Sequence, residues 1–121
     1  MARILLADDD SAMRDFARRA LVADGHHVTV AAEGAEALQM IEAGAALDLL
    51  ITDVQMPALD GLSLAERLAR SHPGLPILLV SGYAVDRERL AELGANIVGL
   101  LQKPVTLDQL RAQTRLALRA G

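Results

Sequence analysis

Five polar side chains that could do chemistry stand where apolar runs of the chain end. Asp8 and Asp9 follow the first run, Asp53 ends the third, Ser81 follows the fourth and Lys103 comes shortly after the fifth. Carboxylates that crowd together repel one another, and Mg²⁺ relieves that repulsion while accepting phosphate oxygens. A hydroxyl and an ammonium group opposite them would complete an anion site. Phosphoryl transfer needs little beyond such positioning and charge neutralisation, so the set fits that chemistry.

Each of these residues also has a simpler explanation when it is taken alone. Asp8 and Asp9 could charge the first turn of a helix, whose dipole favours anions. Asp53 could cap a helix or turn, and Ser81 could bond its own backbone in a loop. Lys103 is the one lysine among twelve basic residues, which suggests a site for a compact charge but also fits a chance surface position. The combination favours a site, because independent caps have no reason to fall at four strand ends.

Strand-like and helix-like segments alternate five times along the chain, judged by apolar runs and by apolar residues at helical spacing. The expected strands are 3–7, 27–31, 48–53, 76–80 and 97–101, and the expected helices are 11–24, 35–43, 61–71, 86–93 and 106–118. Four of the strands are near-continuous apolar runs, which is typical of parallel strands covered on both faces. The pattern predicts an α/β fold with a doubly wound, five-stranded parallel sheet. The carboxyl edge of that sheet would gather the five polar side chains.

Two helix starts carry recognisable capping residues. We expect Ser11 to cap the first helix, because a serine oxygen can accept a backbone N–H of the first turn. Thr106 and Gln109 have the spacing of a capping box, which predicts the start of the last helix. The segment 27–31 partly alternates polar and apolar residues, as a less buried edge strand would.

Composition narrows the possible functions. The chain has 121 residues, of which 52% are hydrophobic, and we expect one domain over 1–121 without an output domain. A net charge of -4 argues against a nucleic-acid-binding surface, which needs a basic face. Cysteine is absent, which fits a reducing compartment, and we expect a cytoplasmic protein. No apolar run is long enough to span a membrane, so we expect no membrane partner.

Four motifs, each at the end of an expected strand, resemble those of the receiver domain of bacterial two-component response regulators. They are Ile4-Leu5-Leu6-Ala7-Asp8-Asp9-Asp10, Asp53-Val54-Gln55-Met56-Pro57 with Asp60-Gly61, Ser81-Gly82-Tyr83-Ala84, and Lys103-Pro104. Any one of them is weak alone, but their order along the whole chain is specific. The resemblance implies a flavodoxin-like fold with strand order 2-1-3-4-5.

The resemblance also implies a phosphorylation site that uses Mg²⁺. Asp53 would be the phosphoacceptor and would take a phosphoryl group from a phosphohistidine on a histidine kinase or histidine phosphotransfer protein. Asp9, Asp53 and the backbone carbonyl of Gln55 would hold the ion, and Asp8 would act mainly through a coordinated water. The chain would then be a signalling switch rather than an enzyme, and it would act on a downstream protein that the sequence does not identify.

Further roles follow from the same resemblance. Ser81 would hydrogen-bond a phosphoryl oxygen, and Lys103 would pair with Asp53 before phosphorylation and with the phosphoryl group after it. The Lys103–Pro104 peptide bond is expected to be cis. Gln55 and Tyr83 occupy positions that tune the rate of dephosphorylation in this family.

Two positions depart from the common receiver pattern. Receivers commonly carry Tyr or Phe three residues before the lysine, where this chain has Leu100. They also usually have a small residue with a methyl group after the hydroxyl residue, where this chain has Gly82 followed by Tyr83. Both features resemble a subgroup with Ser/Thr-Gly-Tyr that lacks the aromatic switch. We therefore expect switching through backbone rearrangement around the short fourth helix, which Gly82 and Gly94 would permit.

Three other functions remain open at this point. The chain could be a receiver domain excised from a hybrid histidine kinase or from a longer regulator. It could be an Asp-nucleophile phosphatase of the haloacid-dehalogenase kind, although that chemistry usually needs an aspartate where Gln55 stands. It could also be a receiver-like domain that no longer accepts phosphate, which the full set Asp8, Asp9, Asp53, Ser81 and Lys103 argues against.

Overall fold

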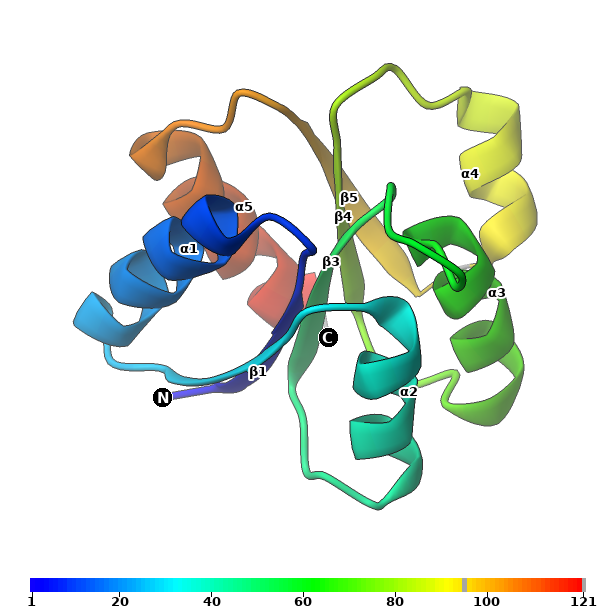
Figure 1. The fold of residues 1–121 in the computed structure, drawn as a ribbon, viewed down its shortest axis with the longest axis horizontal. Helices are drawn as coiled ribbons and strands as arrows, with labels where there is room; N and C mark the ends of the chain where they lie inside the picture. The colour runs from blue at the N-terminus through cyan, green and yellow to red at the C-terminus, as the bar shows by residue number, and fades with distance from the viewer. Residues whose placement is uncertain (95, 121) are drawn as a thin grey trace.

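A five-stranded parallel sheet forms the centre of the computed structural model, which describes residues 1–94 and 96–120 (Figure 1). The strand order is β2-β1-β3-β4-β5, so the predicted doubly wound topology is confirmed. The elements are β1 (Arg3–Ala7), α1 (Ser11–Ala23), β2 (His27–Ala31), α2 (Gly34–Glu42), β3 (Leu49–Asp53), α3 (Gly61–Ser71), β4 (Ile77–Ser81), α4 (Arg87–Leu93), β5 (Ile97–Gln102) and α5 (Leu107–Ala120).

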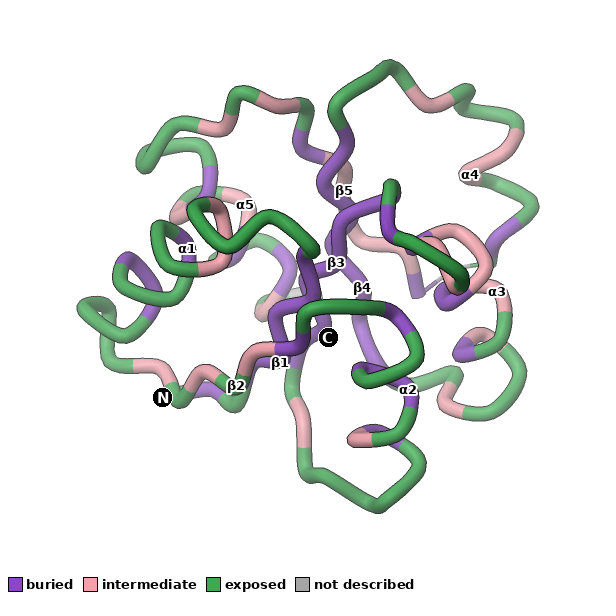
Figure 2. Tube along the Cα trace, in the orientation of Figure 1, coloured by how far each residue is buried: buried purple, intermediate pink, exposed green. Residues whose placement is uncertain are grey.

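Two hydrophobic clusters cover the two faces of the sheet. Side chains such as Ile4, Ile51 and Val80 pack with α1 and α5 on one face. Alternate residues of the same strands, such as Leu5 and Leu79, pack with α2, α3 and α4 on the other face. Because both faces are covered, β3 and β4 are buried throughout, whereas β2 alternates at the edge of the sheet as expected (Figure 2).

The ladder register brings the ends of the strands to a common edge. Thr52 of β3 lies beside Ala7 of β1, and Asp53 lies beside Val80 of β4. Beyond the ladders, the Lys103 N–H donates to the Ser81 carbonyl at 2.7 Å. The residues that follow these strands therefore leave the sheet next to one another.

The capping residues predicted for the last helix are confirmed, whereas the cap predicted for the first helix is wrong. Thr106 and Gln109 form the predicted capping box, with reciprocal N–H to side-chain oxygen bonds of 3.0 and 3.1 Å. The prediction that Ser11 caps α1 is wrong: Asp10 has the extended backbone of a cap, and its carboxylate accepts the Ala12 N–H at 2.9 Å. The third acidic residue after β1 is therefore used to start the helix.

The strand β5 is less covered than its neighbours. Its residues from Ile97 to Leu100 are partly exposed, whereas every residue of β4 is buried. In Figure 1, α4 lies beside α3, and Arg89 of α4 contacts Glu66 of α3 at 3.3 Å. Among the described residues, no helix is both long and apolar enough to cross a membrane.

Candidate functional site

Asp53 stands at the carboxyl end of the central strand β3 with only 3% of its surface exposed. One of its carboxylate oxygens, Oδ1, accepts the Gln55 N–H at 3.1 Å. The other, Oδ2, accepts from Lys103 Nζ at 3.0 Å. A buried carboxylate needs such partners, and here an ammonium and a backbone amide supply them.

Asp8 and Asp9 complete an acidic cluster with Asp53. One carboxylate oxygen from each of the three residues lies within 4.8 Å of the others. Asp8 is buried and Asp9 is exposed. Burial, assisted by the charge of Asp53, raises the pKa of Asp8 to about 6, although the N–H of Asp10 and the ammonium of Lys103 act in the opposite direction.

Lys103 lies between the two buried carboxylates. Its Nζ is 3.4 Å from Asp8 Oδ2, in addition to its contact with Asp53. Burial acts to lower the pKa of Lys103, but the hydrogen bond to Asp53 and the charges of both aspartates outweigh it, so the pKa is raised. The peptide bond between Lys103 and Pro104 is cis, as expected. The only lysine of the chain therefore forms ion pairs with two members of the acidic cluster and remains charged.

Ser81 is fully buried at the end of β4. Its Oγ accepts the Tyr83 N–H at 3.1 Å, which leaves the hydroxyl proton available to another acceptor. The side chain of Gln55 lies over Gly82, because a Cβ on Gly82 would be 3.3 Å from Gln55 Oε1. Tyr83 is 43% exposed.

An open pocket leads from solvent to this edge of the sheet. Its volume is about 530 Å³. It is lined by Asp9, Val54, Gln55, Met56, Pro57, Asp60 and Tyr83. Gln55 and Tyr83 therefore line the same open pocket as Asp9.

Leu100 occupies the position where the sequence departs from the common receiver pattern. It pairs with Leu79 in the β4–β5 ladder and is partly buried against the cluster under α2, α3 and α4. Gly94, which ends α4, has a φ of +112°, a conformation that favours glycine. Gly82 does not have a positive φ.

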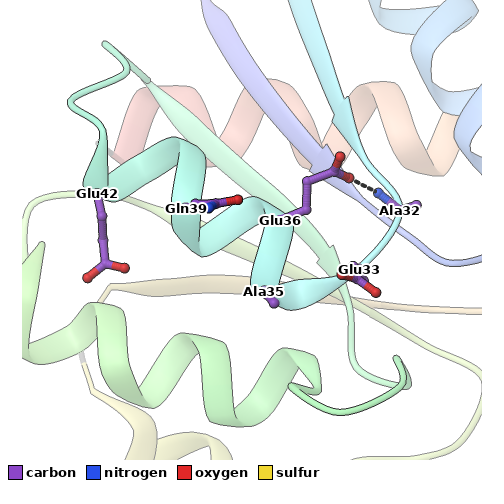
Figure 3. Close-up of a pocket in the computed structure, with 6 residues that line it drawn as sticks. All are labelled: Ala32, Glu33, Ala35, Glu36, Gln39 and Glu42. Atoms are coloured by element: carbon purple, nitrogen blue, oxygen red, sulfur yellow. Dashed lines mark hydrogen bonds between the residues drawn. The ribbon is translucent and has the colours of Figure 1, made fainter.

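A second pocket lies along α2, and its lining includes none of the three aspartates of the acidic cluster. Figure 3 shows its lining, which consists of Ala32, Glu33, Ala35, Glu36, Gln39 and Glu42. The carboxylate of Glu36 accepts the Ala32 N–H at 2.6 Å, which ties the first turn of α2 to the residue before its N-cap, Glu33. The remaining acidic side chains make this a solvated helix face, and none of them belongs to the cluster around Asp53.

The structure adds one residue that the sequence did not single out, Arg14, and shows a close contact of Gly61, which the sequence quoted only as part of a motif. Gly61, at the start of α3, is packed so closely that a Cβ there would overlap the carbonyl oxygen of Asp53. Arg14 of α1 donates from Nη1 to the carbonyl oxygen of Asp8 at 2.8 Å. Both contacts involve the backbone of site residues, so side-chain type alone gave no signal for them.

Comparison with known proteins places this geometry in a family. A family model described as response regulator receiver domain matches residues 4–115. Response regulator MprA from Mycobacterium ulcerans is 43% identical over 117 residues, covering 97% of this chain and 50% of that protein, and MprA from Mycobacterium tuberculosis shows the same identity and coverage. The chain thus spans about half the length of the curated relatives it matches.

Solved structures agree with the family match. A CheY-like receiver domain protein from Methanospirillum hungatei superposes with a TM-score of 0.87 at 30% identity, covering 98% of this chain and 94% of that one. The response regulator TrrA from Thermotoga maritima, solved in complex with Mg²⁺ and BeF, has a TM-score of 0.85 at 27% identity, with coverage of 97% and 99%. Motifs, strand order and relatives agree: the chain belongs to the response regulator receiver family, whose domains are phosphoacceptors in two-component signalling.

Proposed function

We propose that Asp53 is the phosphoacceptor of this chain. The observation that carries this proposal is the meeting of Asp53 with Asp8, Asp9 and Lys103 at the carboxyl edge of the sheet. A carboxylate oxygen of Asp53 forms the new O–P bond while the N–P bond of a phosphohistidine breaks. The electron pair of the broken bond stays on the imidazole of the donor. The donor is a histidine kinase or a histidine phosphotransfer protein.

The acidic cluster fits a hard divalent cation. Three carboxylate oxygens within 4.8 Å of one another form a donor set that suits Mg²⁺. Asp9, Asp53 and the backbone carbonyl of Gln55 would hold the ion, and Asp8 would act through a coordinated water. When bound, the ion supplies positive charge against the phosphoryl oxygens. The Mg²⁺ named with the relative TrrA supports this choice.

Lys103 and Ser81 bind the transferred phosphoryl group. Lys103 Nζ already contacts Asp53 and can follow the negative charge to a phosphoryl oxygen. The hydroxyl of Ser81 has a proton to donate, since its oxygen accepts from Tyr83. Gln55 and Tyr83 at the mouth of the site control how a water reaches the phosphoryl group, and this sets the lifetime of the signal.

The phosphorylated domain acts through protein contacts. We assign the output to the surface of α4, β5 and α5, because β5 is incompletely covered and α4 is attached mainly to α3. Because Leu100 stands in place of an aromatic ring, switching uses a rearrangement of the backbone in the segment that carries Gly82 and Gly94. We assign the domain to the cytoplasm and to signalling rather than to turnover of a substrate, since Gln55 stands where a haloacid-dehalogenase phosphatase usually needs an aspartate.

Intact mass after incubation with acetyl phosphate tests the proposed function. We expect the protein to gain one phosphoryl group when Mg²⁺ is present and none when the metal is removed by a chelator. Acetyl phosphate is a small donor, so the reaction needs no cognate kinase. Absence of an adduct over the whole range of Mg²⁺ concentrations would contradict the assignment.

The affinity for Mg²⁺ is expected to fall as the pH falls through about 6. The pKa of Asp8 is raised to about 6, so its carboxyl group is protonated below that pH and must lose a proton before it can serve a cation. Competition by one proton predicts about tenfold weaker binding at about pH 5 than at about pH 8. Titration followed by the fluorescence of Tyr83, the only tyrosine in a chain without tryptophan, measures this. An Asp8→Asn variant should bind more weakly and lose this pH dependence; an unchanged profile would rule out Asp8 as its source.

Replacement of Lys103 is expected to separate phosphorylation from switching. A Lys103→Ala variant keeps the phosphoacceptor but lacks the ammonium that contacts both buried aspartates. In the wild type, we expect beryllofluoride, a phosphoryl mimic, to change amide exchange over residues 82–94. We expect the variant to fold and to accept a phosphoryl group without that change. An unaltered exchange response in Lys103→Ala would show that Lys103 does not transmit the signal.

A further inference from the structure

Arg14 makes a contact that differs from those of other arginines in the chain. Its Nη1 donates to the backbone carbonyl oxygen of Asp8 at 2.8 Å, in a partly buried position. Arg18, Arg19 and Arg89, by comparison, contact carboxylates near the surface. Arg14 therefore binds the main chain of the site loop rather than an acidic side chain.

The bonded carbonyl belongs to the peptide that joins Asp8 to Asp9. Asp8 is the first residue after β1, and its N–H donates to the backbone carbonyl oxygen of Ala31 at 3.1 Å. The loop then depends on local bonds: the Asp10 N–H donates to Asp8 Oδ1 at 2.9 Å. Rotation of the Asp8–Asp9 peptide would change the direction of the Asp9 side chain, and the bond from Arg14 opposes that rotation.

The position of the positive charge of Arg14 also matters for metal binding. Three consecutive aspartates give the loop a formal charge of three negative units, and Lys103 approaches it through the carboxylates of Asp8 and Asp53. A cation bonded to carboxylate oxygens competes with a metal ion for them. The guanidinium of Arg14 instead stabilises the loop from its backbone side and does not occupy the carboxylate oxygens of Asp9.

We propose that Arg14 is a positioning residue of the cation site, which holds the Asp8–Asp9 peptide in the orientation that presents Asp9 to Mg²⁺. This inference rests on the proposed function in one respect, the binding of Mg²⁺ by the acidic cluster. Residues that orient a metal ligand commonly change affinity by about 10- to 100-fold when they are removed.

The test compares Arg14→Met and Arg14→Lys with Arg18→Met as the matched control. Methionine keeps the aliphatic part of the side chain and removes both charge and donors. Arg18 lies on the same helix and forms an ion pair with Asp15 at the surface. We expect Mg²⁺ affinity, measured by Tyr83 fluorescence, to fall about tenfold in Arg14→Met and to stay unchanged in Arg18→Met. Arg14→Lys should lie between the two.

Amide exchange in the metal-free protein provides a readout that does not depend on the ion. We expect faster exchange of the Asp10 amide in Arg14→Met, because that amide bonds to the side chain of Asp8 in the same loop. Thermal unfolding checks that the variants fold. If Arg14→Met does not fold, the comparison of Arg14→Lys with Arg18→Met tests the positioning role of Arg14.

Three results would contradict the inference or its basis in distinguishable ways. Equal Mg²⁺ affinity in Arg14→Met and Arg18→Met would overturn the positioning role. Full recovery of affinity by Arg14→Lys while the Asp10 amide still exchanges fast would overturn it as well, because charge alone would then explain the effect. Absence of Mg²⁺ binding by the wild type would contradict the proposed function instead, and exchange in the metal-free variants would still decide whether Arg14 orders the loop.

Discussion

Phosphoryl incorporation from acetyl phosphate is expected to fall to background when Asp53 is exchanged for asparagine. The amide of Asn has nearly the same shape as the carboxylate but lacks the anionic oxygen that attacks phosphorus. Asp53 is buried and bonded to Lys103 and to the Gln55 N–H, and the amide oxygen can retain one of these bonds. The variant should therefore fold, and intact mass reports the loss of the adduct.

Two control variants make this result specific. Asp15→Asn removes a carboxylate that contacts arginines at the surface of α1, and it should be phosphorylated as fast as the wild type. Asp9→Asn removes a cation ligand but not the acceptor, so it should slow incorporation and shift it to higher Mg²⁺ concentration. Equal labelling of Asp53→Asn and the wild type would exclude Asp53 as the acceptor.

The second large effect is expected from Gly61→Ala. A Cβ at this position would overlap the backbone carbonyl of Asp53 and lie within 2.9 Å of the Val54 Cα. Neither backbone group can move without disturbing β3, and the Gly61 N–H also bonds the Val54 carbonyl at 2.9 Å. We expect the free energy of unfolding to fall by about 3 kcal/mol, at the upper end of the usual cost of overpacking.

Gly74→Ala is the matched control for this effect. A Cβ on Gly74 would meet no heavy atom within 4 Å, and Gly74 does not have a positive φ. This variant should be as stable as the wild type or slightly more so, because alanine restricts the unfolded chain. Urea unfolding of both variants measures the difference. If the two substitutions cost the same, the close contact between Gly61 and Asp53 does not contribute to stability.

Much of this architecture could be predicted from the sequence because the signals are local. The apolar run before Asp53 and the Thr106–Gln109 capping box specify their own segments, and both predictions are confirmed. The convergence of Asp8, Asp9, Asp53 and Lys103 was predicted from the parallel direction of the strands, which the apolar runs indicate. The strand order 2-1-3-4-5, in contrast, was adopted from a family resemblance rather than from periodicity.

Other features could not be predicted because they depend on backbone geometry. Asp10 and Ser11 are both good capping residues, and only the extended conformation of Asp10 selects it over its neighbour. The bond from Arg14 to the Asp8 carbonyl and the crowding of Gly61 against Asp53 involve main-chain atoms whose positions residue types do not reveal. These contacts hold the site in place, and they are visible only once the chain is folded.

The central claim, that Asp53 carries the phosphoryl group, is tested most directly by locating the adduct. Borohydride reduces an aspartyl phosphate to homoserine, and peptide mass spectrometry of the acetyl phosphate-treated protein then identifies the modified position. We predict homoserine at position 53 in the treated protein and none there in an untreated sample. Homoserine at position 8, 9 or any other aspartate, with position 53 unmodified, would contradict this account.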